Sequence, residues 1–287
     1  MAKTVRNLLG LALLLFSTCA MAQEREEFGY NINSLRPIRN SDQLFKKTLW
    51  WRIDGREKPN RPLFAKNMEI TKVIIEAVRA GIIRPFENDS LKTRMSFETF
   101  MQNMTIPTVD AGLTEEEKAM GFGTEDDGFG SNDGFGDETG GAAQEAVPTE
   151  WLPKELYIME MKEDLIFDKK RSRIYHDIQS LTIYLPAEKN VAKSIEQPIA
   201  SFSYKELVDN VFKDNPDAVW YNNANPKEHR NLAESFELRL FTAHLTKFSN
   251  GDDLTIEDIY GVGKAGIVAS MQVEYDLLDF EAQLWEY

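Results

Sequence analysis

Apolar and polar positions alternate most clearly between residues 156 and 185. In the first half of this stretch, Tyr157, Met159 and Met161 alternate with the charged Glu160 and Lys162, which is the period of a β-strand with one buried face. The second half, rich in isoleucine, leucine and tyrosine up to Leu185, is typical of a longer strand. Residues 162–173 between them are densely charged. The pattern predicts an antiparallel hairpin with a charged turn, whose apolar face helices must cover.

Several further elements follow from helical or alternating periodicity. The best amphipathic helix is predicted around residues 70–78, with Gly81 at the position of a left-handed cap residue. A helix capped by Ser41 is expected to carry Leu44, Phe45, Leu49 and Trp51. The other predicted helices begin after Ser96, Ser203 and Thr255, span 232–248, and run from Ile267 to the C-terminus. Short strands are predicted at 82–86, 198–202 and 218–221. These elements together predict an α+β fold, a small antiparallel sheet centred on the hairpin near 156–185 and covered by several helices.

Residues 1–22 have the pattern of a secretory signal peptide. Lys3 and Arg6 precede an apolar run, and Ala22 ends a small-x-small site before Gln23. The run is too short for a permanent membrane span. Cys19 is the only cysteine, and the residues before it do not fit a lipidation signal. Cleavage after Ala22 therefore predicts an exported chain without disulfides or thiol chemistry.

Residues 108–150 form an acidic, glycine-rich insert that divides the remaining chain into parts 23–107 and 151–287. The insert repeats Gly-Phe-Gly three times and contains few aliphatic residues, a composition that predicts disorder. Its spacing fits neither an EF-hand nor a nonapeptide calcium repeat. Of the chain's net charge of −14, the insert carries most, so the remaining body is only mildly acidic. A protein with this charge lacks the excess of basic residues that binding to nucleic-acid phosphates requires.

The sequence shows no catalytic, cofactor-binding or metal-binding constellation. His176, His229 and His244 lie far apart and lack metal-ligand spacing; the first is expected in a strand and the last in a helix. Glycines at 261, 263 and 266 match a dinucleotide motif but follow no buried strand, so a flexible joint is expected instead. Carboxylate pairs such as Glu163 and Asp164 suit a glycosidase, but in a chain with 47 acidic residues solvated faces are the simpler interpretation.

Adjacent aromatic residues are the main candidates for contact surfaces. Trp50 and Trp51 are consecutive on a predicted helix, where successive residues point about 100° apart and cannot both face one core. Trp220-Tyr221 and the pair Trp285 and Tyr287 are similar. Tryptophan is enriched where partners dock, and the alternative is an aromatic wedge between helix and sheet.

Three blocks of residues give the chain a resemblance to a known family. The first comprises Lys47-Thr48-Leu49-Trp50, Ile53-Asp54, Arg56-Glu57-Lys58, Asn60 and Pro62-Leu63; the second comprises Lys162-Glu163-Asp164, Phe167-Asp168-Lys169 and Arg171-Ser172; the third is Phe280-Glu281-Ala282-Gln283-Leu284-Trp285-Glu286-Tyr287. In this order the blocks resemble the gliding-motility GldN family, also called PorN. The resemblance covers about residues 35–105 and 155–287. Gln283 departs from it, because the family prefers aspartate there.

The resemblance implies a non-enzymatic component of the type IX secretion system of Bacteroidota, in the periplasm at the inner face of the outer membrane. It implies a ring of copies of this chain with a GldK/PorK-like outer-membrane lipoprotein, and contact with a GldM/PorM-like subunit anchored in the inner membrane. No cofactor is expected. The residues expected at partner interfaces are Trp50, Trp51, Arg56, Asp164, Asp168, Arg171 and Trp285.

Two other functions remain open on the sequence. One is a periplasmic protein that binds or hydrolyses glycans through a carboxylate pair and a tryptophan platform. It requires a pocket with two convergent carboxylates. The other is a calcium-regulated adaptor that acts through the insert.

Overall fold

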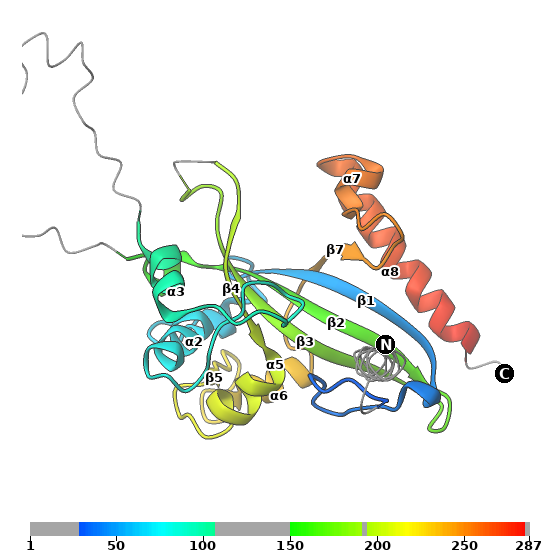
Figure 1. The fold of residues 1–287 in the computed structure, drawn as a ribbon, viewed down its shortest axis with the longest axis horizontal. Coiled ribbons are helices and arrows are strands. Elements are labelled where there is room, and N and C mark those ends of the chain that lie inside the picture. The colour runs from blue at the N-terminus through cyan, green and yellow to red at the C-terminus, as the bar shows by residue number, and fades with distance from the viewer. Residues whose placement is uncertain (1–28, 107–149, 191–193, 285–287) are drawn as a thin grey trace, which may run out of the picture.

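A five-stranded antiparallel sheet organises the protein in this computed structural model, which describes residues 29–106, 150–190 and 194–284 (Figure 1). The strands are β1 Gln43–Asp54, β2 Ile158–Asp168, β3 Arg173–Leu185, β4 Gln197–Ser203 and β7 His244–Phe248. Their order across the sheet is β4-β3-β2-β1-β7. The α+β fold predicted from the sequence is thus confirmed, with the β2–β3 hairpin at the centre of the sheet.

The hairpin differs from its prediction in where the turn lies. Strand pairing runs from Ile158 opposite Tyr184 to Asp168 opposite Arg173, so most of the charged segment is strand and only residues 169–172 form the turn. Ser172 takes a left-handed backbone there, with φ +48°. The charges of the segment therefore lie on the two faces of a sheet, where neighbouring strands and loops determine which of them are buried.

The helix predicted after Ser41 is wrong, because residues 43–54 form strand β1. Residues 40–42 form only a short 3-10 turn, and β1 then pairs along its length with β2. Leu49, Trp51 and Ile53 share one face of this strand, so the same residues suit a strand as well as a helix. Pairing with the distant residues 158–168 decides between the two, and nothing local to β1 encodes that pairing.

Four helical segments cover one half of one face of the sheet. They are α2 Ile70–Arg79, α3 Phe97–Met104, α5 Tyr204–Leu207 with the π-helical turn η5 Val208–Phe212, and α6 Leu232–Glu237. Gly81, at φ +71°, ends α2 as expected: the Gly81 N–H donates to Val78 O at 2.9 Å and the Ile82 N–H to Ala77 O at 2.9 Å, the pairing of a Schellman motif. Ser96 caps α3, whereas Ser203 makes no side-chain cap at α5.

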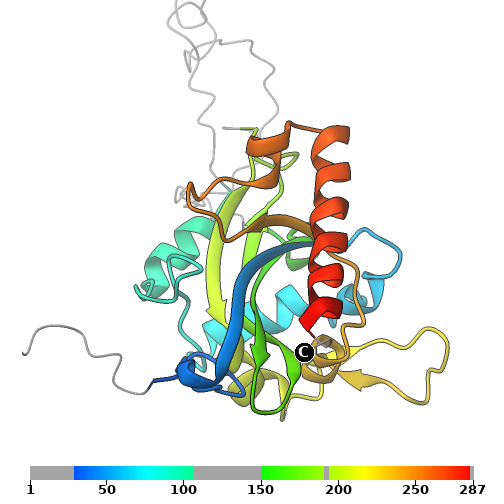
Figure 2. The ribbon, with the colours of Figure 1, turned by 90° about the vertical axis from the view of Figure 1, so that its right-hand side faces the viewer.

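The other half of the same face carries α7 Ile256–Tyr260 and α8 Lys264–Leu284. Figure 2 shows α8 running beside β1 and β7. The helix predicted over residues 232–248 is wrong, since α6 ends at Glu237 and β7 occupies the last five positions. The Thr255–Asp258 capping box and the long final helix are confirmed.

Helix α8 also protects the edge of the sheet. Ser270 Oγ donates to Leu245 O at 2.8 Å, and the Leu245 N–H donates to the carboxylate of Glu274. An open strand edge would otherwise present these two backbone groups to another chain. The edge at Leu245 is therefore closed to strand addition.

Some predicted segments are short or lie outside the described residues. The strand expected at 82–86 is a single bridge at Phe86, and that at 218–221 is β5 Val219–Trp220, paired with β6 Arg230–Asn231. The signal peptide with Ala22 and Gln23, the insert up to residue 149, and Trp285 fall outside the described ranges. Within those ranges, none of the helices combines the length and the apolar character needed to cross a bilayer.

Candidate functional site

The two faces of the sheet differ in chemistry. The core face carries Leu49, Ile53, Met161 and Leu181, all at most 1% exposed, and the helices pack on it. The outer face carries Trp50 and Lys162, which are cross-strand partners. Because side chains alternate along a strand, Glu163 and Asp164 point to opposite faces.

A polar cluster lies at the junction of the two halves of the core face. Glu163, whose side chain is fully buried, accepts hydrogen bonds from Arg239 at 2.7 and 3.3 Å, and His176 Nδ1 lies 3.4 Å from its Oε1. Arg239 follows α6 in a left-handed conformation, φ +51°, and its guanidinium lies 5.6 Å from the centre of the Trp51 ring. Trp51 contacts the apolar residues of both halves. The cluster therefore joins the α2–α6 half to the α7–α8 half.

Glu163 remains ionised in this cluster. Burial alone would raise the pKa of its carboxyl, but the hydrogen bonds and charges of His176 and Arg239 outweigh burial, so the pKa lies below its ordinary value. The carboxylate is thus a fixed structural anion with its partners in place, and it is a poor proton donor near neutral pH.

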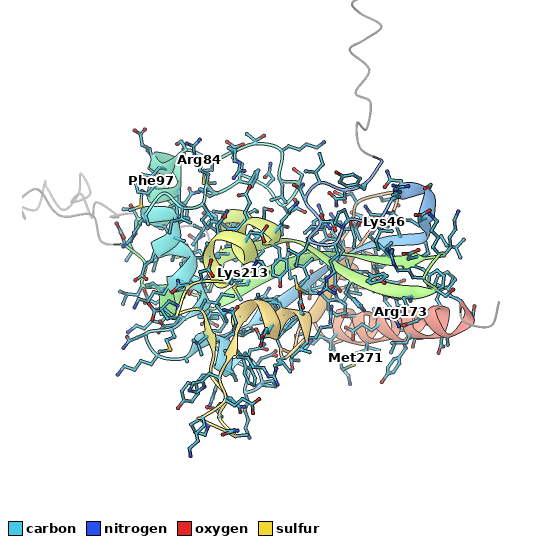
Figure 3. The ribbon with its side chains drawn as sticks, turned by 90° about the horizontal axis from the view of Figure 1, so that it is seen from below. Lys46, Arg84, Phe97, Arg173, Lys213 and Met271 are labelled. Carbon is cyan, nitrogen blue, oxygen red and sulfur yellow. The ribbon has the colours of Figure 1, made fainter. Side chains whose placement is uncertain are left out.

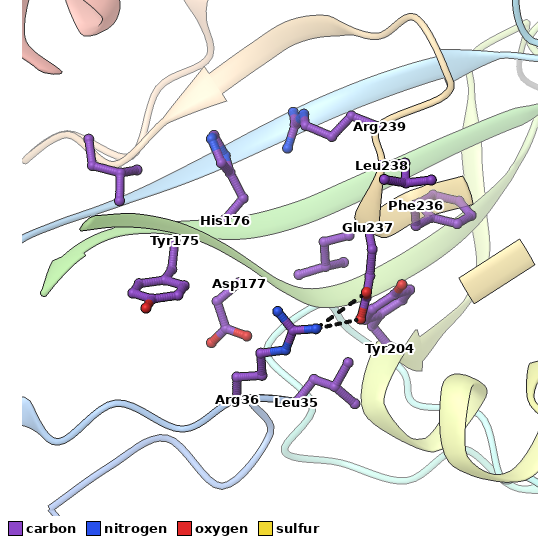
Figure 4. A pocket seen from close by; sticks show the side chains of 12 residues that line it. Leu35, Arg36, Tyr175, His176, Asp177, Tyr204, Phe236, Glu237, Leu238 and Arg239 are labelled. Atoms are coloured by element: carbon purple, nitrogen blue, oxygen red, sulfur yellow. Dashed lines mark hydrogen bonds and ion pairs between the residues drawn. The ribbon is translucent and has the colours of Figure 1, made fainter. Parts of the chain in front are cut away.

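A cavity of about 270 Å³ lies beside this cluster (Figure 4). It lies along residues 174–178 of β3, which precede Ser180, the first residue of β3 that pairs with β4. Figure 4 shows Arg36 of the N-terminal arm reaching across to Glu237 of α6, with which it forms an ion pair at 3.2 Å. Small-molecule sites usually occupy about 300–1,000 Å³, so this cavity is small.

The charged groups that line the cavity bind one another. Arg36 pairs with Glu237, and Arg239 and His176 with Glu163. Burial raises the pKa of Asp177, and hydrogen bonds from Ser34 and Gln179 partly offset it. Glu163 and Glu237 are thus held by ion pairs, and Asp177 is held by hydrogen bonds alone.

Trp50 is held on the outer face by its cross-strand neighbours. Its Nε1–H donates to Asp89 Oδ2 at 2.9 Å, and the ammonium groups of Lys162 and Lys247 lie 5.1 and 4.8 Å from its ring. Trp50 and Trp51 thus point to opposite faces, as residues of a strand do. Both are half-buried, but only Trp50 has a hydrogen-bond partner for its indole N–H, since the buried Nε1 of Trp51 has none among the described residues.

Arg56 is exposed and bound by its own neighbours. Its guanidinium pairs with Asp54 at 3.0 Å and with Glu188 at 3.0 Å, and stacks over the Tyr157 ring at 4.3 Å. Because the side chain is 53% exposed, one edge of this group remains available to a partner.

Asp164, Asp168 and Arg171 stabilise the central hairpin from within. Asp164 is buried and binds Thr48 Oγ1 at 2.7 Å and Lys46 Nζ at 2.9 Å. Asp168 is fully buried and accepts hydrogen bonds from the backbone N–H groups of Lys170 and Arg171 and from the Arg171 guanidinium. Burial raises the pKa of Asp168, but these bonds outweigh it and the pKa is lowered. Only Arg171 of the three is exposed.

Replacing Asp168 by alanine tests this turn. Loss of the two backbone hydrogen bonds leaves N–H groups without their acceptor, so Asp168→Ala is expected to lower the free energy of unfolding by about 1–2 kcal/mol in urea titrations. Arg171→Ala is the matched control and is expected to cost less, because the Arg171 side chain is exposed and the two backbone N–H groups still bind the Asp168 carboxylate. Equal losses in both variants would show that the ion pair, not the turn cap, matters.

The largest unpartnered feature among the described residues is α8, which sequence periodicity did not single out. Its exposed apolar side chains include Ile267, Val268, Met271, Tyr275 and Leu278, and Met271 points away from the sheet (Figure 3). The signal was present in the sequence: α8 has apolar residues on all sides, which is typical of a helix covered from more than one direction.

The described residues contain no group of three or more metal-ligating side chains. His176 lies in β3 as predicted, whereas His244 lies in β7 and not in a helix, with Nε2 2.9 Å from Glu57 Oε1. Gly261 and Gly263, at φ +100° and +80°, join α7 to α8. They follow a helix, so the joint lies where it was expected, and its flexibility stays a prediction.

Comparison with protein-family models gives a match that covers most of the described residues. The model of the family described as "Gliding motility associated protein GldN" matches residues 38–286, which is most of the chain. No curated protein matches the sequence. The matched range contains β1 and its following turn, where Asn60 is fully buried and binds backbone groups of Asp54 and Thr242. Asn60, one of the residues that carried the resemblance, therefore stabilises the fold.

Proposed function

Because the chain belongs to the GldN family of gliding motility associated proteins, which are components of gliding motility and type IX secretion, we propose that it is a non-enzymatic structural subunit of that machinery. In this proposal it forms a ring with further copies of itself and with a GldK/PorK-like outer-membrane lipoprotein. It also contacts a GldM/PorM-like subunit anchored in the inner membrane. The predicted signal peptide supports a periplasmic location at the inner face of the outer membrane.

The exposed apolar side of α8 is the observation that carries the assembly role. Met271, Tyr275 and Leu278 are 54%, 64% and 59% exposed on one helix. Isolated exposed apolar residues are ordinary, but a contiguous set of this kind marks a surface that a partner covers. A subunit of a multi-protein complex needs such a surface, whereas a freely diffusing periplasmic enzyme does not.

The cavity supports a structural role in preference to glycan hydrolysis. A glycosidase needs two carboxylates that converge on an open cleft. Here Glu163 is buried under Arg239 and His176, and Glu237 is paired with Arg36. Trp50, the candidate sugar platform, is covered by two lysines. The glycan alternative therefore gains no support from this site.

The proposal is tested by co-purification from the native host. The chain, tagged at its C-terminus and expressed from its own locus, is solubilised from envelope fractions and its partners are identified by mass spectrometry. We expect the lipoprotein and the inner-membrane-anchored subunit at near-constant ratio to the bait, with an untagged strain as control. Recovery of the chain alone as a soluble monomer would contradict the proposal.

A further inference from the structure

Helix α8 carries two apolar stripes, of which the protein itself covers one. The covered stripe comprises Ala269, Val273 and Leu277 and ends at Phe280, which is 37% exposed. Val273 packs with Leu49, Leu165 and Leu245, and the Phe280 ring lies 4.7 Å from that of Phe45. The spacing of four, four and three residues keeps these side chains on one side of a helix. This stripe fixes α8 to the sheet.

The second stripe lies on the opposite side of the helix. Met271 and Leu278 are seven residues apart, as are Val268 and Tyr275, and all four are more than half exposed. At 3.6 residues per turn, a seven-residue spacing returns to nearly the same side of the helix. The stripe is thus a continuous seam along about three turns, with the heptad spacing that a second helix recognises.

Acidic side chains border this seam on both sides. By helical position Glu274 and Glu281 follow one border, and Asp276 and Asp279 follow the other, while Lys264 is the only basic residue of α8. Asp276 lies near Lys47, where its charge opposes the lowering of the lysine pKa that burial causes. Glu274 accepts the Leu245 N–H and lies near His244 and Arg239, whereas Asp279 and Glu281 form no ion pair with the other described residues. The seam is therefore apolar in the middle and negative at its rims.

We propose that this seam docks an amphipathic helix of a different protein, with lysine or arginine beside its own apolar stripe. This inference rests on the proposed role as an assembly subunit and names the chemistry of one partner. Flanking charges of opposite sign select helix partners, and like charges oppose them. Pairing of α8 with α8 from a second copy would place Glu274 and Asp276 against acidic residues in either direction. The charges thus favour a basic helix over self-association.

Synthetic helices provide the test. Two 21-residue peptides share leucines at heptad core positions and differ only in their flanking residues, lysine in one and glutamate in the other. Binding to the full mature chain is measured by fluorescence anisotropy at 50 mM and 500 mM salt. We expect the lysine peptide to bind at least tenfold more tightly than the glutamate peptide, with some affinity remaining at high salt because the seam is apolar.

A double variant separates docking from general attraction to an acidic protein. Met271→Glu with Leu278→Glu removes the apolar seam and adds negative charge, so non-specific attraction of the lysine peptide would increase whereas docking would fall. We expect at least a tenfold loss of binding, with an unchanged circular dichroism melting curve because both side chains are exposed. The control is Ile82→Glu with Ile195→Glu, two side chains 54% and 59% exposed elsewhere on the surface, which should leave binding unchanged.

Three outcomes would overturn the inference. These are equal binding of the two peptides, unchanged binding by the Met271→Glu and Leu278→Glu variant, and concentration-dependent self-association that this variant abolishes. The last would identify a second copy as the occupant. Failure of the peptide test with intact co-purification from the host would reject the seam alone, whereas loss of all envelope partners from the unmodified chain would reject the proposed function.

Discussion

Replacing Arg239 by methionine is expected to lower the free energy of unfolding by about 3–5 kcal/mol, because it leaves the carboxylate of Glu163 buried without its main partner. Glu163 has no exposed side-chain surface, whereas Arg239 is one third exposed. The loss should therefore be larger for Arg239→Met than for Glu163→Leu, after which Arg239 can turn to water. Urea unfolding of both variants measures the difference.

Arg36→Met is the matched control, since it removes an arginine–glutamate pair from the same cavity. Arg36 and Glu237 are 71% and 46% exposed, and such pairs contribute about 0–1 kcal/mol. The double variant Glu163→Leu with Arg239→Met should recover much of the loss, because it leaves no buried charge. A loss for Arg239→Met as small as that for Arg36→Met would show that the buried pair does not join the two halves of the core.

The same pair predicts a direction for the effect of pH. The pKa of Glu163 is lower in the folded protein than in the unfolded chain, where a glutamate titrates near about 4.3. Its contribution to stability is therefore fully present above the unfolded pKa and is lost as the pH falls through the folded value. The stability difference between the natural chain and Glu163→Gln should shrink below about pH 4.

The second large effect is expected at Asn60, which connects the turn after β1 to the segment before β7. Its side-chain N–H₂ donates to Asp54 O at 2.9 Å and to Thr242 O at 2.8 Å, and the Thr242 N–H donates to Asn60 Oδ1 at 2.7 Å. Asn60→Ala leaves these backbone groups without partners in a fully buried place, and each orphaned group costs about 1–3 kcal/mol. We expect Asn60→Ala to lower the free energy of unfolding by about 3 kcal/mol in urea titrations.

Asn225→Ala is the control, because Asn225 is exposed on a loop and a surface change there should stay within about 0.5 kcal/mol. Asn60→Asp provides an independent check. It keeps the acceptor for Thr242 N–H but turns a carboxylate oxygen toward two carbonyl oxygens. The pKa of the new carboxyl should therefore be raised in the folded protein, and the variant should become less stable as the pH rises. A pH-independent loss would contradict this assignment of the hydrogen bonds.

The sequence by itself determined the elements whose signals are local. The alternation of apolar and polar residues predicted the β2–β3 hairpin. The helical spacing of apolar residues, together with Gly81, predicted α2 and the position of its end. Ser96 and Thr255 gave the starts of α3 and α7. Each of these signals resides in neighbouring residues, since caps, turns and periodicity act over a few positions. The order of the motif blocks also indicated the family, although it indicated no contact.

Only the tertiary structure decided which apolar positions become strand and which surfaces remain free. Residues 43–54 fit a helix or a strand, and pairing with residues 158–168, more than a hundred positions away, makes them β1. Likewise Glu163 and Arg239 are 76 positions apart, so neither residue could indicate the other. The sequence shows that α8 is apolar on several sides, but only packing against Leu49, Leu165 and Leu245 shows which stripe is covered and which is exposed, because burial depends on distant elements of the chain.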